Sequence, residues 1–311
     1  MSEQDRHLMN QAESRNGEGA ADTPAGRSAF SHRWLSDFAY ALLNPLRLER
    51  EEWEDLPLTR LAPPGLKVQA EFMPLLLSFR DLTAPQRAIL LSRIEAREQQ
   101  GDSYLCGLLN SDAENSVLSA HLSRLLVRTR QDNGQLYLLR YYDPRVMRHL
   151  QWLLTDKQHV AFCGPISVWS WPASSGWNTS RRLAQYSPGQ QLVLHPHQWA
   201  TLERLALINR ALTELEILAP DLPQNDALFQ WLDAALVQAS TELALTDSEE
   251  WLFCAIQSVR FHPQIHHHPQ LLERLGQAAT KRGSYAAACA DLDDSAWLGM
   301  AEELNSRMPT A

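Results

Sequence analysis

The spacing of hydrophobic positions alternates between strand-like and helix-like patterns along the first two thirds of the chain. Short apolar runs that predict strands lie at 38–43, 72–79, 104–109, 135–141 and 166–171. Segments with apolar residues three and four positions apart, which predict helices, lie at 48–61, 83–98 and 113–130. Strands that alternate with helices favour an α/β architecture with a small mixed β-sheet flanked by helices.

Residues 135–141 are apolar or aromatic at both alternating sets of positions. A strand that is apolar on both faces is typical of the middle of a sheet covered on both sides, so we expect this strand to be central. Asp143 and Pro144 follow it. Aspartate is a favoured helix N-cap, and proline suits the first helical position, where its missing N–H is no loss. A helix should therefore begin at Pro144.

The predicted helix after Pro144 has one apolar face and one unusual polar face. The apolar positions share a spacing of three or four and are Val146, Met147, Leu150, Leu153 and Leu154. Arg145, Arg148 and Trp152 lie together on the other face, so we expect Trp152 to be partly exposed, or covered by the other lobe or by a partner. Thr155 is expected to cap a second short helix that ends at Gly164.

From His195 onward the hydrophobic period is helical throughout. Helices that each bury one apolar stripe predict an all-helical lobe. Residues 1–30 are polar and rich in Gly, Ala and Ser, which is typical of a disordered leader. The sequence therefore predicts a leader at 1–30, an α/β lobe at 31–194 and a helical lobe at 195–311.

Charge, hydrophobicity and cysteine content exclude some classes of protein and favour one cellular compartment. The net charge is −9, and residues 195–311 hold 16 acidic against 7 basic residues. An acidic chain lacks the basic face that phosphate contact requires, which argues against nucleic-acid binding. No run of about 18 apolar residues occurs, so no membrane span is expected. Four scattered cysteines without a CxxC pair favour a reducing, cytoplasmic compartment.

Two groups of residues could carry chemistry. The histidines of the 262–268 segment, His262, His266, His267 and His268, could bind a metal ion and serve a metal-dependent hydrolase, although Pro263 favours a solvated loop instead. His159 and Cys163 could form a base and a nucleophile, but nothing in the sequence orients the histidine, and a small buried thiol at a helix end is the favoured interpretation. No catalytic motif accompanies either group, so the residues give an enzyme no positive support.

The stretch described above resembles the type VI secretion effector-adaptor family, also called Tap or TEC chaperones. The residues that carry the resemblance are LYLLRYYDPRV (Leu136 to Val146), the helix that follows it, the segment from Gly164 to Trp171, and AYALLNPLR (Ala39 to Arg47). The resemblance implies a cytoplasmic adaptor without cofactor that binds a secreted effector toxin. It also implies that the adaptor promotes loading of that effector onto the spike protein VgrG.

An adaptor must hold another protein and release it, and Trp, Tyr and Arg dominate the energetics of such interfaces. We expect Arg140, Arg145 and Arg148 to supply hydrogen bonds to a partner, in a groove between the 140–177 region and the helical lobe. We expect the apolar contact area to come from aromatic residues, namely Tyr142, Trp152, Trp169 and Trp171. For Trp169 and Trp171, burial in the core is the ordinary alternative. A protein-binding module unrelated to secretion also fits these residues.

Overall fold

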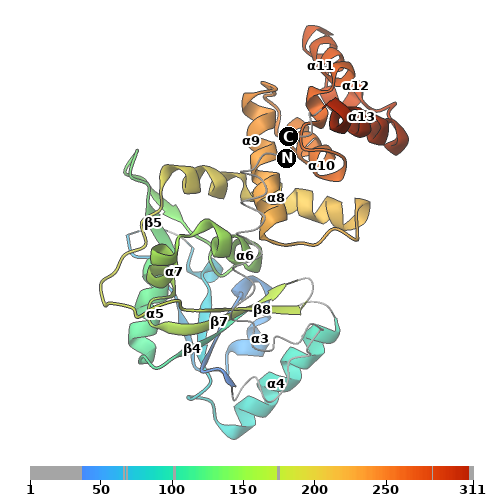
Figure 1. Cartoon of the computed structure of the whole chain (residues 1–311). Coiled ribbons are helices and arrows are strands. Elements are labelled where there is room, and N and C mark those ends of the chain that lie inside the picture. The colour runs from blue at the N-terminus through green and yellow to red at the C-terminus, as the bar shows by residue number, and fades with distance from the viewer. Residues whose placement is uncertain are drawn as a thin grey trace. The chain divides into compact units, whose positions relative to one another are not determined.

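The computed structural model describes residues 37–65, 67, 69–100, 103–173, 176–281 and 283–307 (Figure 1). These residues form two compact units, 37–199 and 200–307, and the division falls inside helix α8 (Pro196–Leu218). The leader predicted at 1–30 lies outside the described residues. None of the described helices has the length and hydrophobicity needed to cross a bilayer.

The first unit is built on a six-stranded antiparallel sheet. Its strands, in spatial order, are β2 (Leu58–Arg60), β3 (Leu75–Ser78), β1 (Tyr40–Leu43), β4 (Leu105–Ser111), β7 (Ile166–Ala173) and β8 (Gly176–Arg181). The predicted α/β class is confirmed. The predicted mixed sheet is wrong in strand direction, because each strand runs antiparallel to its neighbours.

The predicted central strand at 135–141 is wrong. Strand β6 is only Leu136–Leu138 and pairs with β5 (Val127–Thr129) in a separate two-stranded ribbon. Leu136 is 41% exposed. The tight turn between β5 and β6 explains the difference, because Gly134 adopts a positive φ and donates its N–H to the carbonyl of Arg130, which returns the chain onto the preceding segment. The central places belong to β1 and β4, which are almost entirely buried.

Helices cover the sheet and close its core. They are the short α3 (Arg50–Trp53), α4 (Ala84–Gln99), α5 (Asn115–Leu125), α6 (Pro144–Leu153) and α7 (Asp156–Cys163). The helix predicted over 48–61 is therefore largely wrong, since α3 has four residues and β2 follows it. Leucines of β1 and β3 pack with Leu90 and Ile94 of α4 in one cluster. Helices α6 and α7 both pack on β7 (Figure 1).

The helix ends around α6 and α7 follow the predicted rules. The Asp143 side chain caps α6, and Thr155 and Gln158 form a reciprocal capping box at the start of α7. Gly164 ends α7 with a φ of 56° and a ψ of −122°. Only glycine adopts that conformation without strain.

A buried amide pair holds the first turn of α8 against α6 and α7. Gln158 and Gln198 donate to each other's side-chain oxygens at 2.8 and 2.7 Å, and Gln198 also donates to the carbonyl of Leu153 at 2.6 Å. Both glutamines are buried, so each hydrogen bond replaces a bond to water that the fold removes. This pair fixes where α8 leaves the first unit.

The second unit is all-helical, as predicted. After α8 it contains α9 (Asp226–Thr241), α10 (Ser248–Arg260), the 3-10 turn η3 (Ile265–His267), α11 (Pro269–Lys281), α12 (Tyr285–Ala288) and α13 (Asp294–Arg307). Residues of α9 to α13, including Tyr285 and Trp297, share one apolar core.

We predict that Gly164→Ala destabilises the first unit by about 3–5 kcal/mol. A methyl group at Gly164 would overlap the imidazole ring of buried His121, in addition to the strain of the positive φ. Gly134→Ala is the matched control, because Gly134 also has a positive φ but meets no described atom within 4 Å. It should cost only about 1 kcal/mol. Urea denaturation of both variants tests this, and equal losses would contradict the steric role of His121.

Candidate functional site

One carboxylate at the start of α6 organises two arginines. Oδ1 of Asp143 accepts from the backbone N–H of Arg145 at 3.0 Å and from its Nε at 3.1 Å. Oδ2 accepts from the terminal nitrogen of Arg145 at 2.9 Å and lies 3.5 Å from that of Arg140. Arg145 and Arg140 are 69% and 49% exposed, whereas Asp143 is only 11% exposed. Two exposed cations thus share one carboxylate.

The ionisation of Asp143 is secured by these contacts. Burial by itself would raise the pKa of the Asp143 carboxyl, but the hydrogen bonds from Arg145 and the nearby charges bring this pKa below its usual value. Asp143 is therefore ionised at neutral pH and carries one negative charge against two positive ones. The Arg140 guanidinium also lies 5.9 Å from the centre of the Tyr142 ring. We call Arg140, Asp143 and Arg145 the arginine pair site.

The polar face of α6 continues from this site as predicted. Arg148 and Trp152 are both half-buried, so the expected partial exposure of Trp152 is confirmed. The indole N–H of Trp152 donates to Nδ1 of His149 at 3.2 Å, and the two rings meet edge to face. His149 is fully buried. The hydrophobic pattern gave no indication of this polar support for Trp152.

The other aromatic residues of the predicted site lie in the core. Trp169 is 1% exposed, stacks on Phe162 with ring centres 5.1 Å apart, and meets Tyr141 edge to face. Trp171 and Tyr142 are buried as well. Trp169 and Trp171 are therefore core residues, which was the alternative to a role in partner contact. Of the expected contact residues, only Arg140, Arg145, Arg148 and Trp152 reach the surface of the first unit.

The histidine segment is not a solvated loop, which corrects the favoured interpretation of the sequence. His262, His266 and His268 are buried, because η3 packs against α10, α11 and α13. His266 lies between two partners: Nε2 is 3.0 Å from the carbonyl of Cys254 and Nδ1 is 2.9 Å from the hydroxyl of Tyr285. A carbonyl only accepts, so Nε2 carries the proton and Tyr285 donates to Nδ1.

A metal-dependent hydrolase would need several of these side chains to converge. Across the described residues, no three His, Cys, Asp or Glu side chains gather in a way that could hold a metal ion. His268 lies 3.2 Å from Glu303, whereas His267 is 3.5 Å from Glu242. The histidines therefore point to different protein partners and make structural contacts.

Cys163 is a buried thiol at the end of α7. Burial raises the pKa of this thiol to about 12, so it is protonated at neutral pH. Its sulfur is 3.8 Å from the ring nitrogens of His159, and Nε2 of His159 is 3.0 Å from the hydroxyl of Ser180. A protonated thiol without access to solvent is a poor nucleophile, which supports the structural interpretation of this pair.

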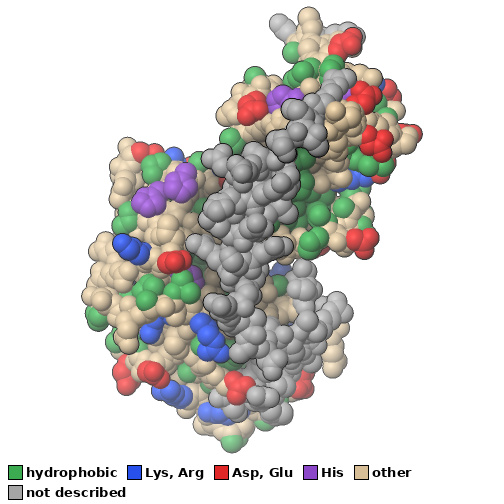
Figure 2. All heavy atoms as spheres, viewed as in Figure 1, with side chains coloured by type: hydrophobic (Ala, Val, Ile, Leu, Met, Phe, Trp, Pro, Cys, Tyr) green, Lys and Arg blue, Asp and Glu red, His purple; other side chains and the backbone are tan. Residues whose placement is uncertain are grey.

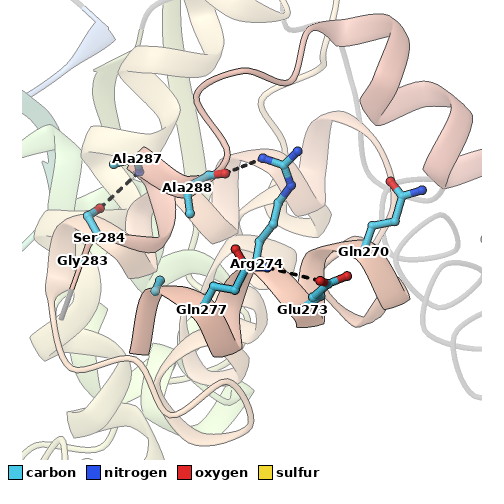
Figure 3. A pocket seen from close by; sticks show the side chains of 9 residues that line it. Gln270, Glu273, Arg274, Gln277, Gly283, Ser284, Ala287 and Ala288 are labelled. Carbon is cyan, nitrogen blue, oxygen red and sulfur yellow. Dashed lines mark hydrogen bonds between the residues drawn. The ribbon is translucent and has the colours of Figure 1, made fainter. Parts of the chain in front are cut away.

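A pocket of about 670 Å³ lies between α11 and α12 of the second unit (Figure 3). Two charged residues, Glu273 and Arg274, line it. Arg274 donates to the carbonyl of Ala288 and pairs with Asp291. Glu273 accepts from the Gln277 side chain. The Ser284 hydroxyl accepts from the N–H of Ala287 and caps α12. These polar groups hold the helix turn together.

Charge differs between the two units. In the second unit the arginines Arg204, Arg210, Arg260 and Arg274 each pair with a carboxylate. Residues 195–311 hold 16 acidic and 7 basic residues, so acidic side chains remain in excess after these pairs. Figure 2 shows Lys and Arg side chains spread over the visible face of the first unit.

We predict that the stability of the chain falls at acidic pH partly through His266. Burial lowers the pKa of His266 to about 4, below the value of 6.5 expected when unfolded. Between these values the unfolded chain binds a proton that the folded chain does not, so stability is lost as the pH falls from 6.5 toward 4, by up to about 3 kcal/mol. Urea denaturation at pH 7 and pH 4.5 measures this loss.

The His266→Gln variant is the control, because glutamine keeps a donor and an acceptor but does not titrate. Its loss of stability between the two pH values should be smaller than that of the wild type. Buried His121, whose pKa is also lowered to about 4, contributes to both proteins and cancels in the comparison. Identical losses would show that His266 is not a source of the acid sensitivity.

Comparison with known proteins gives one family match. A family model described as a domain of unknown function (DUF4123) matches residues 39–161. No curated protein and no solved structure matches the chain. The matched segment begins at β1 and ends within α7, so it contains the arginine pair site and the polar face of α6. Trp169, Trp171 and the second unit lie beyond it.

Proposed function

We propose that this chain is a non-catalytic adaptor that binds a type VI secretion effector and promotes its loading onto the VgrG spike. The family matched by residues 39–161 is associated with such adaptors. The observation that carries the proposal is the arginine pair site, which lies inside the matched segment and presents two cations on one buried carboxylate. This arrangement suits recognition of another protein.

The arginine pair site would act through preorganised donors. Arginine presents a planar fork of N–H groups that matches a carboxylate. Asp143 accepts two hydrogen bonds from the Arg145 fork and lies 3.5 Å from the Arg140 guanidinium before a partner arrives. The Arg145 side chain is thus partly ordered before binding, which reduces the entropy lost at the interface. A partner with acidic side chains would find an excess of positive charge here.

Trp152 would supply the apolar part of the same contact. Its indole N–H is engaged by His149, so the ring has a defined orientation while part of its surface stays accessible. Tryptophan beside arginine is the composition enriched at interface hot spots. Arg148 lies between Arg145 and Trp152 on this face of α6 and would extend the contact.

The acidic second unit would contribute to the choice of partner. Its excess of carboxylates favours association with a surface of opposite charge and disfavours an acidic one. An adaptor with two differently charged units can in this way distinguish its effector from the spike protein. Because both contacts are electrostatic, binding should weaken as salt is added.

We predict that Arg145→Glu combined with Trp152→Ala weakens effector binding at least 100-fold, which corresponds to about 3 kcal/mol. The change reverses the charge of the exposed fork and removes the aromatic surface. The Arg145→Glu change should cost little stability, because the Arg145–Asp143 pair is largely exposed and contributes at most about 1 kcal/mol. Trp152→Ala removes the donor to buried His149 and should cost about 1–3 kcal/mol, so binding is measured well below the melting temperature of the variant. Co-purification with a type VI secretion effector, followed by calorimetry, measures the effect.

Lys157→Glu is the matched control, because Lys157 is an exposed cation on the neighbouring helix α7. It should leave binding unchanged. If the wild type binds the toxin and the double variant binds equally well, the arginine pair site is wrongly placed. If the wild type binds neither the toxin nor VgrG, the adaptor function itself fails, and a binding module unrelated to secretion becomes the better hypothesis.

A further inference from the structure

Strand β8 forms one edge of the six-stranded sheet. It pairs with β7 over six residues, Gly176–Arg181, and on its other side no described strand follows. Its exposed residues include Asn178, Thr179 and Arg181. An edge strand presents backbone N–H and C=O groups that another extended chain can pair with.

The register shows which backbone groups of β8 point outward. In an antiparallel pair, residues alternate between those that bond to the neighbouring strand and those that face away from it. The N–H of Arg182 donates to the carbonyl of Ser167 of the β7 side at 3.0 Å. Every second residue before Arg182 has the same orientation, so the backbone N–H and C=O groups of Ser180 and Asn178 also face β7. Those of Thr179 and Arg181 therefore face the open side of the strand.

Other hydrogen bonds agree with this alternation. The carbonyl of Asn178 accepts from the hydroxyl of Ser170 on β7, so it faces inward. Within the described part of the chain, no backbone hydrogen bond outside the β7–β8 pair involves Thr179 or Arg181. Two N–H and two C=O groups are therefore available along this edge.

The two edges of the sheet differ in how they are protected. The β2 edge has three half-buried residues, and Asn115 of α5 donates to the Thr59 hydroxyl beside it. Strand β8 is twice as long, contains no proline, and keeps a continuous register with β7. Register shifts occur elsewhere in the sheet, in the pairs that the central strand β4 forms with β1 and with β7. Short length, proline and bulges are the usual devices that prevent strand addition.

We propose that β8 is a second docking site, at which an extended segment of the effector adds to the sheet as a further strand. The inference rests on the proposed adaptor function and names a contact separate from the arginine pair site. Thr179 and Arg181 supply the backbone hydrogen bonds. Arg181 is exposed and forms no ion pair within the described chain, so the added segment should carry an acidic side chain next to it.

Charge complementarity favours this occupant over a second copy of the chain. A second β8 would bring another Arg181 to the edge and raise the local positive charge, whereas an acidic segment neutralises it. Main-chain pairing also tolerates varied side chains, which suits an adaptor that must bind a segment without a deep pocket.

Thr179→Pro tests the site. Proline removes an N–H that faces away from β7 and is tolerated at such edge positions, so the thermal melt should stay within about 3 °C of the wild type. Binding of the effector should weaken at least tenfold. Thr179→Val is the matched control, because it keeps the N–H and removes only the side-chain hydroxyl that lies 3.0 Å from that of Ser170. It should bind like the wild type.

Amide hydrogen exchange of the full chain supplies an independent measurement. In the free protein, the amides of Thr179 and Arg181 should exchange rapidly and that of Ser180 slowly. Addition of the effector should protect Thr179 and Arg181. A complex that forms without this protection, or that Thr179→Pro leaves intact, overturns the β8 site while the adaptor function stands.

Protection in the free chain would also overturn the proposal. Protection that is independent of concentration would place this chain's own residues 1–36 on the edge, and protection that appears only at high concentration would indicate a second copy. Failure of the wild-type chain to bind the effector at all would overturn both the β8 site and the adaptor function.

Discussion

The contact between Trp169 and Phe162 is the interaction on which the first unit depends. It joins β7 to α7 by parallel stacking, and Tyr141 closes the cluster with its ring edge against both rings. The Tyr141 hydroxyl donates to the carbonyl of Leu122 in α5 at 3.0 Å, so three elements meet at one buried side chain. Close packing of this kind leaves little freedom for the residues that follow Tyr141.

This packing explains how the surface site is held. Tyr141 is buried, and two residues later the chain reaches Asp143, which caps α6 and holds both arginines. The site therefore stands directly on the aromatic core. Tyr142, Trp169 and Trp171 are buried, whereas Arg140, Arg145 and Trp152 reach the surface.

The two proposed contacts use different physical means. The arginine pair site offers charge and forked hydrogen bonds, which depend on the side chains of the partner. The β8 edge offers main-chain hydrogen bonds, which depend only on an extended partner backbone. Together the two sites would bind effector segments that differ in sequence from one another. Two weak contacts on the same partner raise the overall affinity above that of either contact alone. Release of the effector can then begin with the dissociation of one contact, which leaves only the weaker remaining contact to dissociate.

Local rules in the sequence determined the helix ends, the all-helical second unit and the polar face of α6. Asp143, Thr155 and Gly164 act within one turn of themselves, so their roles need no knowledge of distant residues. Tertiary structure decided that β1 and β4 take the centre of the sheet and which aromatic residues are buried. Residues 135–141 match a central strand in pattern, yet the turn at Gly134 pairs them locally with β5. The burial of Trp169 and His266 depends on partners far along the chain, which no local pattern contains.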